Sequence, residues 1–239
     1  MESLSGKVVV VTGGTRGIGR AIARRLLKED ASVMICGQSR QSVERAVSEL
    51  KEGGEIAGIA ADIATPAGAH QLFQATEQAF GGLDVLVNNA GTGAFRKVGE
   101  MTVEEWHRNI DLNLSGAFYC SHEALGRFDK KRGGFIVNIS SLAGKNAFSG
   151  GAGYNASKFG LNGFSEALML DHRYDNVRVS CIMPGSVQTE FPGSSLARAE
   201  DTSWMIMPEE VAEVVAMVLR MPGRTMVSSV EMRPSQPRK

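Results

Sequence analysis

Short runs of β-branched and other apolar residues alternate with longer stretches of helical periodicity along the whole chain. The runs are apolar at consecutive positions, which is typical of parallel strands that are buried on both faces. Seven strands are expected, at residues 7–11, 32–36, 56–60, 84–87, 135–139, 177–182 and 228–232. Six helices are expected between them, at residues 18–29, 41–51, 68–80, 103–125, 155–170 and 208–219. This order predicts a doubly wound α/β fold, in which helices cover both faces of a seven-stranded parallel sheet.

Nothing in the composition divides the chain or points to a charged partner. The 239 residues contain no internal repeat and no linker, so one domain over residues 1–239 is expected. Basic and acidic residues number 26 each, so no net field attracts nucleic acid or an anionic membrane. The longest apolar stretches, such as residues 8–11, are far below the roughly 18 residues of a membrane span. We therefore expect neither nucleic acid nor membrane as a partner.

The three cysteines indicate a reducing compartment. Cys36, Cys120 and Cys181 lie far apart, each among apolar neighbours, which is typical of buried thiols rather than of a disulfide set. The first seven residues include Glu2 and precede no extended apolar segment, so they do not resemble a signal peptide. A cytoplasmic protein is expected. The four histidines are scattered without the spacing of metal ligands, so no metal site is expected.

The longest helical stretch, residues 103–125, repeats an apolar residue every four positions. These residues are Trp106, Ile110, Leu114 and Phe118. Such a stripe most often faces the core, and we expect it to do so here. Asn113 lies among these apolar neighbours, where a buried amide needs hydrogen-bond partners.

In sheets of this kind, ligands bind beyond the carboxyl ends of the strands. The first loop at this edge joins the first strand to the first helix, and its candidate ligand-binding residues are Thr12, Gly13, Thr15, Arg16, Gly17, Ile18 and Gly19. Glycines allow a tight turn and a close approach of the backbone to a pyrophosphate, and the helix N-terminus adds free N–H groups. An ordinary turn is the alternative, but the position between strand and helix favours a dinucleotide site.

The end of the second strand bears on which dinucleotide binds. An NAD site usually has a carboxylate here that accepts a hydrogen bond from the ribose 2′-hydroxyl, but residues 31–41 contain no acid. A 2′-phosphate instead needs cations and donors, which Arg16, Arg40 and Ser39 offer. We therefore expect NADP(H) rather than NAD(H). The alternative is that both arginines are solvated surface charges.

A tyrosine and a lysine four residues apart open the helix after the fifth strand. Tyr154 and Lys158 share one helical face, and Ser141 precedes Tyr154 by thirteen positions. A tyrosine has a pKa of about 10, so acid–base work near neutral pH asks for a fall of roughly three units, about 4 kcal/mol. An ammonium about 4 Å away supplies about 4 kcal/mol at an effective dielectric near 20, while desolvation works against it. The pair could therefore act as an acid–base unit.

The combination of these motifs resembles the short-chain dehydrogenase/reductase family over about residues 5–190. The motifs are Gly13-x3-Gly17-x-Gly19, Asn88-Asn89-Ala90-Gly91, Asn113, Ser141 and Tyr154-x3-Lys158. The resemblance implies a Rossmann-type domain and a catalytic tetrad of Asn113, Ser141, Tyr154 and Lys158. Tyr154 is expected to exchange a proton with the substrate, and Ser141 to place the carbonyl oxygen. Lys158 is expected to hold the nicotinamide ribose, and Asn113 to bind a relay water. Ser140 is the alternative to Ser141.

The same resemblance implies further contacts to the dinucleotide. Near the adenine these are Asp62 and Ile63, and after the fourth strand they are Asn89, Ala90 and Gly91, whereas Asn88 is expected to tie strands together. After the sixth strand they are Pro184, Gly185, Val187 and Thr189, beside the nicotinamide. For several of these residues, a plain turn is the alternative.

We therefore expect an NADP(H)-dependent oxidoreductase that interconverts a ketone and a secondary alcohol, with a 3-oxoacyl thioester as the favoured substrate. The alternatives are an NAD-dependent alcohol dehydrogenase and a catalytically silent dinucleotide-binding regulator. Residues 190–207 are expected to cover the substrate, where Trp204 either lines an apolar pocket or simply packs. A homodimer or homotetramer is expected. The tetramer is in doubt because the last strand runs into Arg233-Pro234 without the family's glycines.

Overall fold

The computed structural model describes residues 1–191 and 201–237. The strands are β1 (Val8–Val11), β2 (Ser32–Gly37), β3 (Ile56–Ala60), β4 (Val85–Asn88), β5 (Gly134–Ile139), β6 (Val177–Pro184) and β7 (Ser229–Met232). The α-helices are α1 (Gly17–Leu27), α2 (Arg40–Leu50), α3 (Pro66–Phe80), α4 (Val103–Ile110), α5 (Gly116–Leu125), α6 (Ala152–His172) and α7 (Pro208–Leu219). All strands are parallel, in the order β3-β2-β1-β4-β5-β6-β7. The expected doubly wound sheet is thus confirmed.

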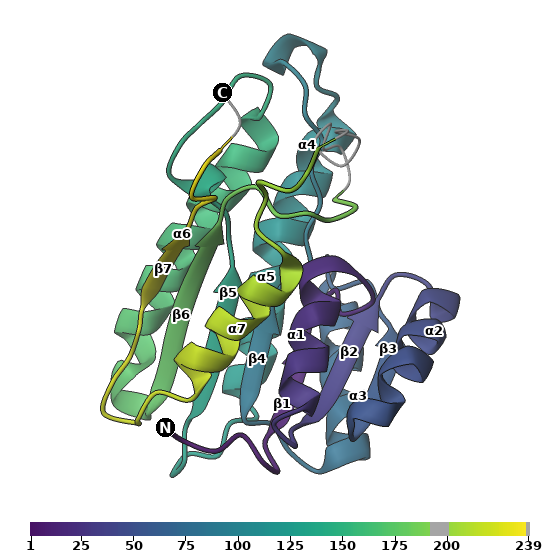
Figure 1. Ribbon diagram of the computed structural model, residues 1–239, viewed down its shortest axis with the longest axis vertical. Coiled ribbons are helices and arrows are strands. Elements are labelled where there is room, and N and C mark those ends of the chain that lie inside the picture. Colours follow the sequence, from purple (N-terminus) through teal and green to yellow (C-terminus); the bar gives the residue numbers. More distant parts are fainter. Residues whose placement is uncertain (192–200, 238–239) are drawn as a thin grey trace.

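Helices cover both faces of the sheet, and the central strands explain why. Val9 and Val11 of β1 face one core, together with residues of α1, α2 and α7. Val10, between them, faces a second core with residues of α3, α5 and α6. Because alternate side chains point to opposite faces, an entirely apolar strand can be buried on both sides. Figure 1 shows α1 and α7 side by side across one of these faces.

Local sequence signals fix several helix ends. Thr65 caps α3 by accepting a hydrogen bond from the N–H of Gly68, and Pro66 occupies the first turn. Gly81 ends the same helix in the left-handed region, with φ of 76°. Thr102 and Glu105 form a reciprocal capping box at the start of α4. By contrast, α1 starts without a side-chain cap, so no side chain at the cap position accepts a hydrogen bond from its first N–H groups.

The expectation that residues 103–125 bury their apolar stripe is wrong. The side chains of Trp106 and Phe118 are 40% and 48% exposed, whereas Asn113 and Cys120 are buried. The inner face consists of small and polar side chains, which let the helix approach the sheet closely. The helix is also not continuous, because residues Asp111–Ser115 form a π-helical segment, η3, between α4 and α5.

The segment before α7 is mainly packed. Residues 192–200 of the expected substrate cover lie outside the described residues. Met205 and Ile206 are buried, and Ile206 pairs with Val187 in a short parallel bridge. The indole Nε1 of Trp204 is buried without a hydrogen-bond partner in the described part of the chain. The contacts of Met205 and Ile206 favour the packing alternative for this part of the segment.

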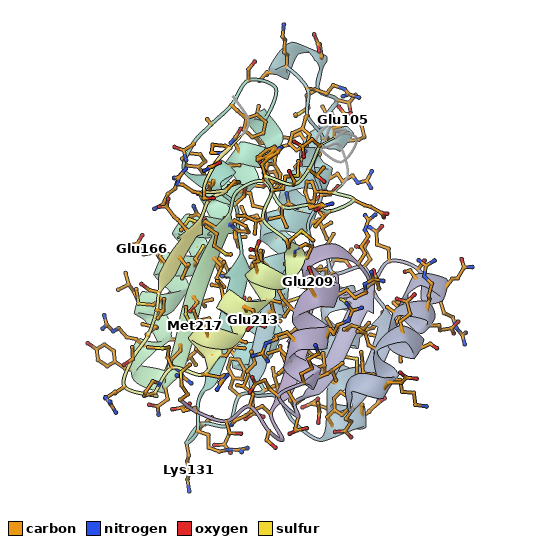
Figure 2. All side chains as sticks on the ribbon, viewed as in Figure 1. Glu105, Lys131, Glu166, Glu209, Glu213 and Met217 are labelled. Atoms are coloured by element: carbon orange, nitrogen blue, oxygen red, sulfur yellow. The ribbon has the colours of Figure 1, made fainter. Side chains whose placement is uncertain are left out.

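Several surface and core features of the described residues bear on partners. Cys36, Cys120 and Cys181 are buried free thiols, as expected. None of the helices in the described ranges is long and apolar enough to cross a membrane. No three potential metal ligands among histidine, cysteine and acidic residues cluster within the same ranges. Figure 2 shows Lys131 at the end of the molecule opposite to Glu105 of α4, so the basic turn around Lys131 lies away from the loops that carry the motifs.

Candidate active site

The candidate site lies where the order of the strands reverses. β1 pairs with β4 on one side and with β2 on the other, so the loops after β1 and β4 lie together. The hydroxyl of Thr12 accepts hydrogen bonds from the N–H groups of Asn89 and Ala90, at 2.9 and 3.0 Å. The amide of Asn89 donates to the carbonyl of Thr12 at 2.9 Å and to that of Gly13 at 3.3 Å. These side chains, both predicted to contact the dinucleotide, hold the two loops against each other.

The glycine turn is shaped so that side chains would not fit. Gly13 and Gly17 have φ of 64° and 53°, in the left-handed region. A Cβ at Gly13 would lie 2.9 Å from the Cα of Ala90. A Cβ at Gly19 would lie 2.3 Å from the carbonyl oxygen of Gly13. This bare turn leads into the uncapped start of α1, which has no acid in its first turn. The arrangement fits a pyrophosphate.

The residues predicted to bind a 2′-phosphate have partners of their own within α2. The hydroxyl of Ser39 caps α2 by accepting a hydrogen bond from the N–H of Ser42 at 3.3 Å. The guanidinium of Arg40 pairs with Glu44 at 2.7 Å, and this carboxylate raises the pKa of Arg40. Arg16 is exposed at the N-terminus of α1. Ser39 therefore has a structural role as a helix cap. The ion pair of Arg40 is largely exposed, so a ligand could replace it.

The two residues predicted near the adenine differ in exposure. Asp62 is exposed, and its carboxylate accepts a hydrogen bond from the N–H of Ala64 at 3.2 Å. The side chain of Ile63 is buried in the core with α3 and α5. Only the main chain of Ile63 is therefore placed to meet a ligand.

Asn88 ties strands together, as expected. Its amide donates to the side-chain oxygen of Asn138 on β5 at 2.9 Å and to the hydroxyl of Ser121 on α5 at 3.1 Å. Asn138 in turn donates to Ser165 of α6 at 2.8 Å. This buried network fixes the spacing of the strands below the site.

Asn113 is buried in the π-helical segment and has the partners that its position requires. Its oxygen accepts from the N–H of Thr92 at 2.8 Å, and its amide donates to the carbonyl of Thr92 at 2.9 Å. The amide also donates to the hydroxyl of Ser157 at 3.0 Å. A Cβ placed at Gly91 would lie 3.3 Å from the Asn113 oxygen and 3.9 Å from the Nζ of Lys158. Gly91 therefore marks a narrow space between the two predicted tetrad members.

Tyr154, Lys158 and Ser141 meet above the end of β5. The buried ammonium of Lys158 donates to the carbonyl of Ile139 at 2.9 Å and lies 5.9 Å from the ring centre of Tyr154. Burial lowers the pKa of Lys158 to about 8. Burial also raises the pKa of Tyr154, and a hydrogen bond with Ser141 opposes that rise. In the protein alone, desolvation thus outweighs the attraction on which the expected fall of the tyrosine pKa relied.

Two asparagines of α6, which the sequence analysis did not single out, fasten the loop that carries Ser141. The amide of Asn155 donates to the carbonyl of Ala143 at 2.6 Å. The side-chain amide of Asn162 donates to the carbonyl of Gly144 at 2.9 Å. Its side-chain oxygen accepts a hydrogen bond from the hydroxyl of Ser140 at 2.5 Å. Ser140 is thereby occupied, which favours Ser141 as the residue facing the substrate. An asparagine among apolar neighbours of a predicted helix was the available signal, as for Asn113.

The loop after β6 returns over the glycine turn. Pro184 ends β6, and the N–H of Gly185 donates to the carbonyl of Met232 at 2.8 Å. A Cβ at Gly17 would lie 3.3 Å from the methyl group of Thr189. Thr189, predicted beside the nicotinamide, therefore lies directly against the glycine turn predicted to hold the pyrophosphate.

Known proteins share both the fold and the sequence of this chain. A family model described as short chain dehydrogenase matches residues 7–199. A 3alpha-hydroxysteroid dehydrogenase of Mediterraneibacter gnavus is 34% identical over 190 residues, which are 78% of this chain and 76% of that protein. An alcohol dehydrogenase from the archaeon Thermococcus sibiricus, solved with 5-hydroxy-NADP, has a TM-score of 0.89 at 29% identity and covers 98% of each chain. A metagenomic short-chain oxidoreductase solved with NADP has a TM-score of 0.85 at 35% identity, covering 99% of this chain and 100% of that one.

These relatives bind a nicotinamide dinucleotide or bear dehydrogenase names, and the match includes the glycine turn and the tyrosine–lysine pair. The chain therefore belongs to the short-chain dehydrogenase/reductase family and is a nicotinamide-dependent oxidoreductase of alcohols and ketones.

Proposed function

We propose that this protein interconverts a ketone and a secondary alcohol with NADP(H), using Tyr154 as the acid and base. The observation that carries the proposal is the meeting of Tyr154, Ser141 and Lys158 at the carboxyl end of β5. The uncapped start of α1 and the bare glycine turn supply the dinucleotide site at the same edge of the sheet.

The surroundings of Tyr154 suit proton donation to a carbonyl oxygen. Bound NADPH supplies the hydride that the carbonyl carbon takes up. The hydroxyl of Tyr154 donates its proton to the carbonyl oxygen. Burial raises the pKa of this hydroxyl in the protein alone, so a nearby positive charge has to offset the cost of forming the phenolate. Ser141 donates a hydrogen bond to the same oxygen and places it. The ammonium of Lys158 stabilises the phenolate that remains, and Asn113 holds a water that returns the proton.

The residues that hold the dinucleotide in this proposal are those that the sequence analysis predicts. They are Thr12, Gly13, Thr15, Arg16, Gly17, Ile18, Gly19, Ser39, Arg40, Asp62, Ile63, Asn89, Ala90, Gly91, Tyr154, Lys158, Pro184, Gly185, Val187 and Thr189. Two relatives of solved structure carry NADP or a derivative of it, which supports NADP(H) over NAD(H). The absence of any acid at residues 31–41 supports the same choice.

Initial rates with 2,3-butanedione test the reaction. Tyr154→Phe should lower turnover at least about 100-fold, because a positioned acid contributes roughly that much or more. Tyr174→Phe, at an 89% exposed tyrosine, should have no effect and serves as the matched control. If the protein binds NADPH but turns over no ketone, a silent dinucleotide-binding regulator becomes the better explanation.

The choice of dinucleotide is tested with the same assay. Arg16→Ala and Arg40→Ala should each raise the KM for NADPH about tenfold or more while leaving the KM for NADH within about twofold. Arg45→Ala, at an exposed arginine of α2, is the control. Equal effects on both dinucleotides would instead support the NAD-dependent alcohol dehydrogenase.

The substrate is a ketone or alcohol whose class the fold alone does not specify. The 3-oxoacyl thioester remains a prediction, and acetoacetyl-coenzyme A is its probe. The relative from Mediterraneibacter gnavus is named for hydroxysteroids, which makes a cyclic ketone a second candidate.

The outward apolar stripe supports a homodimer at least. Trp106 and Phe118 are exposed on α4 and α5, and Phe159 and Leu170 are 46% and 52% exposed on neighbouring α6. Large apolar side chains gathered on one surface are typical of a protein–protein interface. A second copy of the chain would cover both helices.

A further inference from the structure

Two phenylalanine rings lie against the ring of Tyr154, and a third packs against one of them. The ring centre of Phe95 lies 5.5 Å from that of Tyr154, and the ring centre of Phe191 lies 5.7 Å from it. Phe148 lies 5.8 Å from Phe95. Each ring comes from a different loop at the carboxyl edge of the sheet, after β4, β5 and β6 respectively. We call Phe95, Phe148 and Phe191 the aromatic wall.

The wall is not part of either buried core. Phe148 is 47% exposed, and Phe95 and Phe191 are half-buried. Gly93 makes room for two of the rings, because a Cβ there would lie 2.7 Å from the Cζ of Phe95 and 2.8 Å from the Cε1 of Phe191. Rings left partly open beside a reactive hydroxyl offer a large apolar surface to whatever binds there.

Two cations on the described parts of these loops, Arg96 and Lys145, already have acidic partners. The guanidinium of Arg96 donates to the carbonyl of Phe95 at 3.0 Å and lies 3.8 Å from Glu105. The ammonium of Lys145 pairs with Glu231 at 2.5 Å. Glu190, directly before Phe191, is an exposed carboxylate. A substrate carboxylate that approached Arg96 or Lys145 would therefore have to displace an existing ion pair.

We propose that the aromatic wall makes this site selective for neutral ketones whose carbonyl belongs to, or adjoins, a flat apolar ring. The inference rests on the proposed function, in which Tyr154 donates its proton to that carbonyl. The substrate ring packs against Phe148 and Phe95 while its oxygen reaches Tyr154 and Ser141. Because Phe191 contacts Tyr154 from the loop after β6, it completes the pocket on the remaining side.

The test compares three ketones with NADPH: 2-tetralone, which is neutral and bicyclic, neutral 2-decanone, and anionic pyruvate. The wild-type protein should have a kcat/KM for 2-tetralone at least about tenfold above that for 2-decanone and about 100-fold above that for pyruvate. Phe148→Leu should lower kcat/KM for 2-tetralone about three- to tenfold, mainly through KM, since one aromatic pair is lost. It should lower that for 2-decanone by less. Tyr174→Leu, at an exposed ring away from the wall, is the control.

A binding measurement separates this inference from the proposed function. Calorimetric titration of the NADP-loaded protein with 2-tetralone reports on the wall without turnover. Reduction of 2,3-butanedione without any preference for 2-tetralone would refute the selectivity proposed for the aromatic wall and support the proposed reaction. Tighter 2-tetralone binding by the wild type than by Phe148→Leu, with no turnover of any ketone, would keep the wall and overturn the reaction. Equal or absent binding together with absent turnover would overturn both.

Discussion

Replacing Lys158 with methionine should change how the stability of the protein depends on pH. Burial lowers the pKa of this lysine from 10.5 to about 8, a difference of about 2.5 units. At about 1.36 kcal/mol per unit, the charged ammonium destabilises the folded state by about 3 kcal/mol. The unfolded chain binds the extra proton between pH 8 and pH 10.5, so in this window the stability of the wild type rises with pH. Below pH 8 the full penalty is present.

Urea denaturation at constant protein concentration measures this effect. From pH 7 to pH 10 the free energy of unfolding of the wild type should rise by about 2.5 kcal/mol relative to Lys158→Met. The lost hydrogen bond to Ile139 shifts the variant by a constant amount, because a neutral amine can still donate it. Lys28→Met, at an exposed lysine, should run parallel to the wild type. A constant difference between wild type and Lys158→Met over this range would refute the burial of a charged amine.

Three further changes have defined outcomes. Gly19→Ala places a methyl group 2.3 Å from the carbonyl oxygen of Gly13, so NADPH affinity, measured by fluorescence titration, should fall about tenfold or more; unchanged affinity would contradict the close approach. Asn155→Ala removes the hydrogen bond that fastens the loop bearing Ser141, so kcat should fall about tenfold while the KM for NADPH stays within about twofold. Phe118→Glu places a charge on the outward stripe, so sedimentation should show a shift from dimer to monomer; an unchanged sedimentation coefficient would count against this interface.

The central strands could be predicted because they are buried at nearly every position, whereas the edge strands β3 and β7 are only partly buried. A run such as Val8–Val11 is apolar at every position, and only a parallel sheet covered on both faces uses such runs. The glycine turn was equally readable, because Gly13 and Gly17 adopt a backbone conformation that other residues avoid. In both cases one local pattern admits few structures.

The stripe on residues 103–125 misled for a physical reason. Hydrophobicity assigns Phe118 to the core, but the interior position is taken by Asn113, whose three good hydrogen bonds make its burial possible. The π-helical segment around Asn113 also shifts the phase between α4 and α5. The spacing of apolar residues reveals neither the hydrogen-bond partners of Asn113 nor the π-helical segment.

The sequence motifs predict the catalytic residues of the site but not the aromatic residues around them. Tyr154 and Lys158 share a helix, so their spacing alone brings them together. Phe95, Phe148 and Phe191 come from three loops, and only the folded sheet brings Phe95 and Phe191 against Tyr154 and Phe148 against Phe95. The direction of the tyrosine pKa likewise depends on burial, which depends on the same loops.

The last strand also bears on how copies of this protein meet at high concentration. β7 pairs with β6 alone and lies at one edge of the sheet, so its outer side offers unpaired backbone groups to any other strand. Glu231 of β7 pairs with Arg233, which directly follows the strand, and Pro234 comes next with no N–H to extend the ladder. Charge and proline together make strand-by-strand growth across this edge unfavourable. If copies of this protein associate, this edge therefore favours association through other surfaces, such as the exposed apolar side chains of α4 and α5.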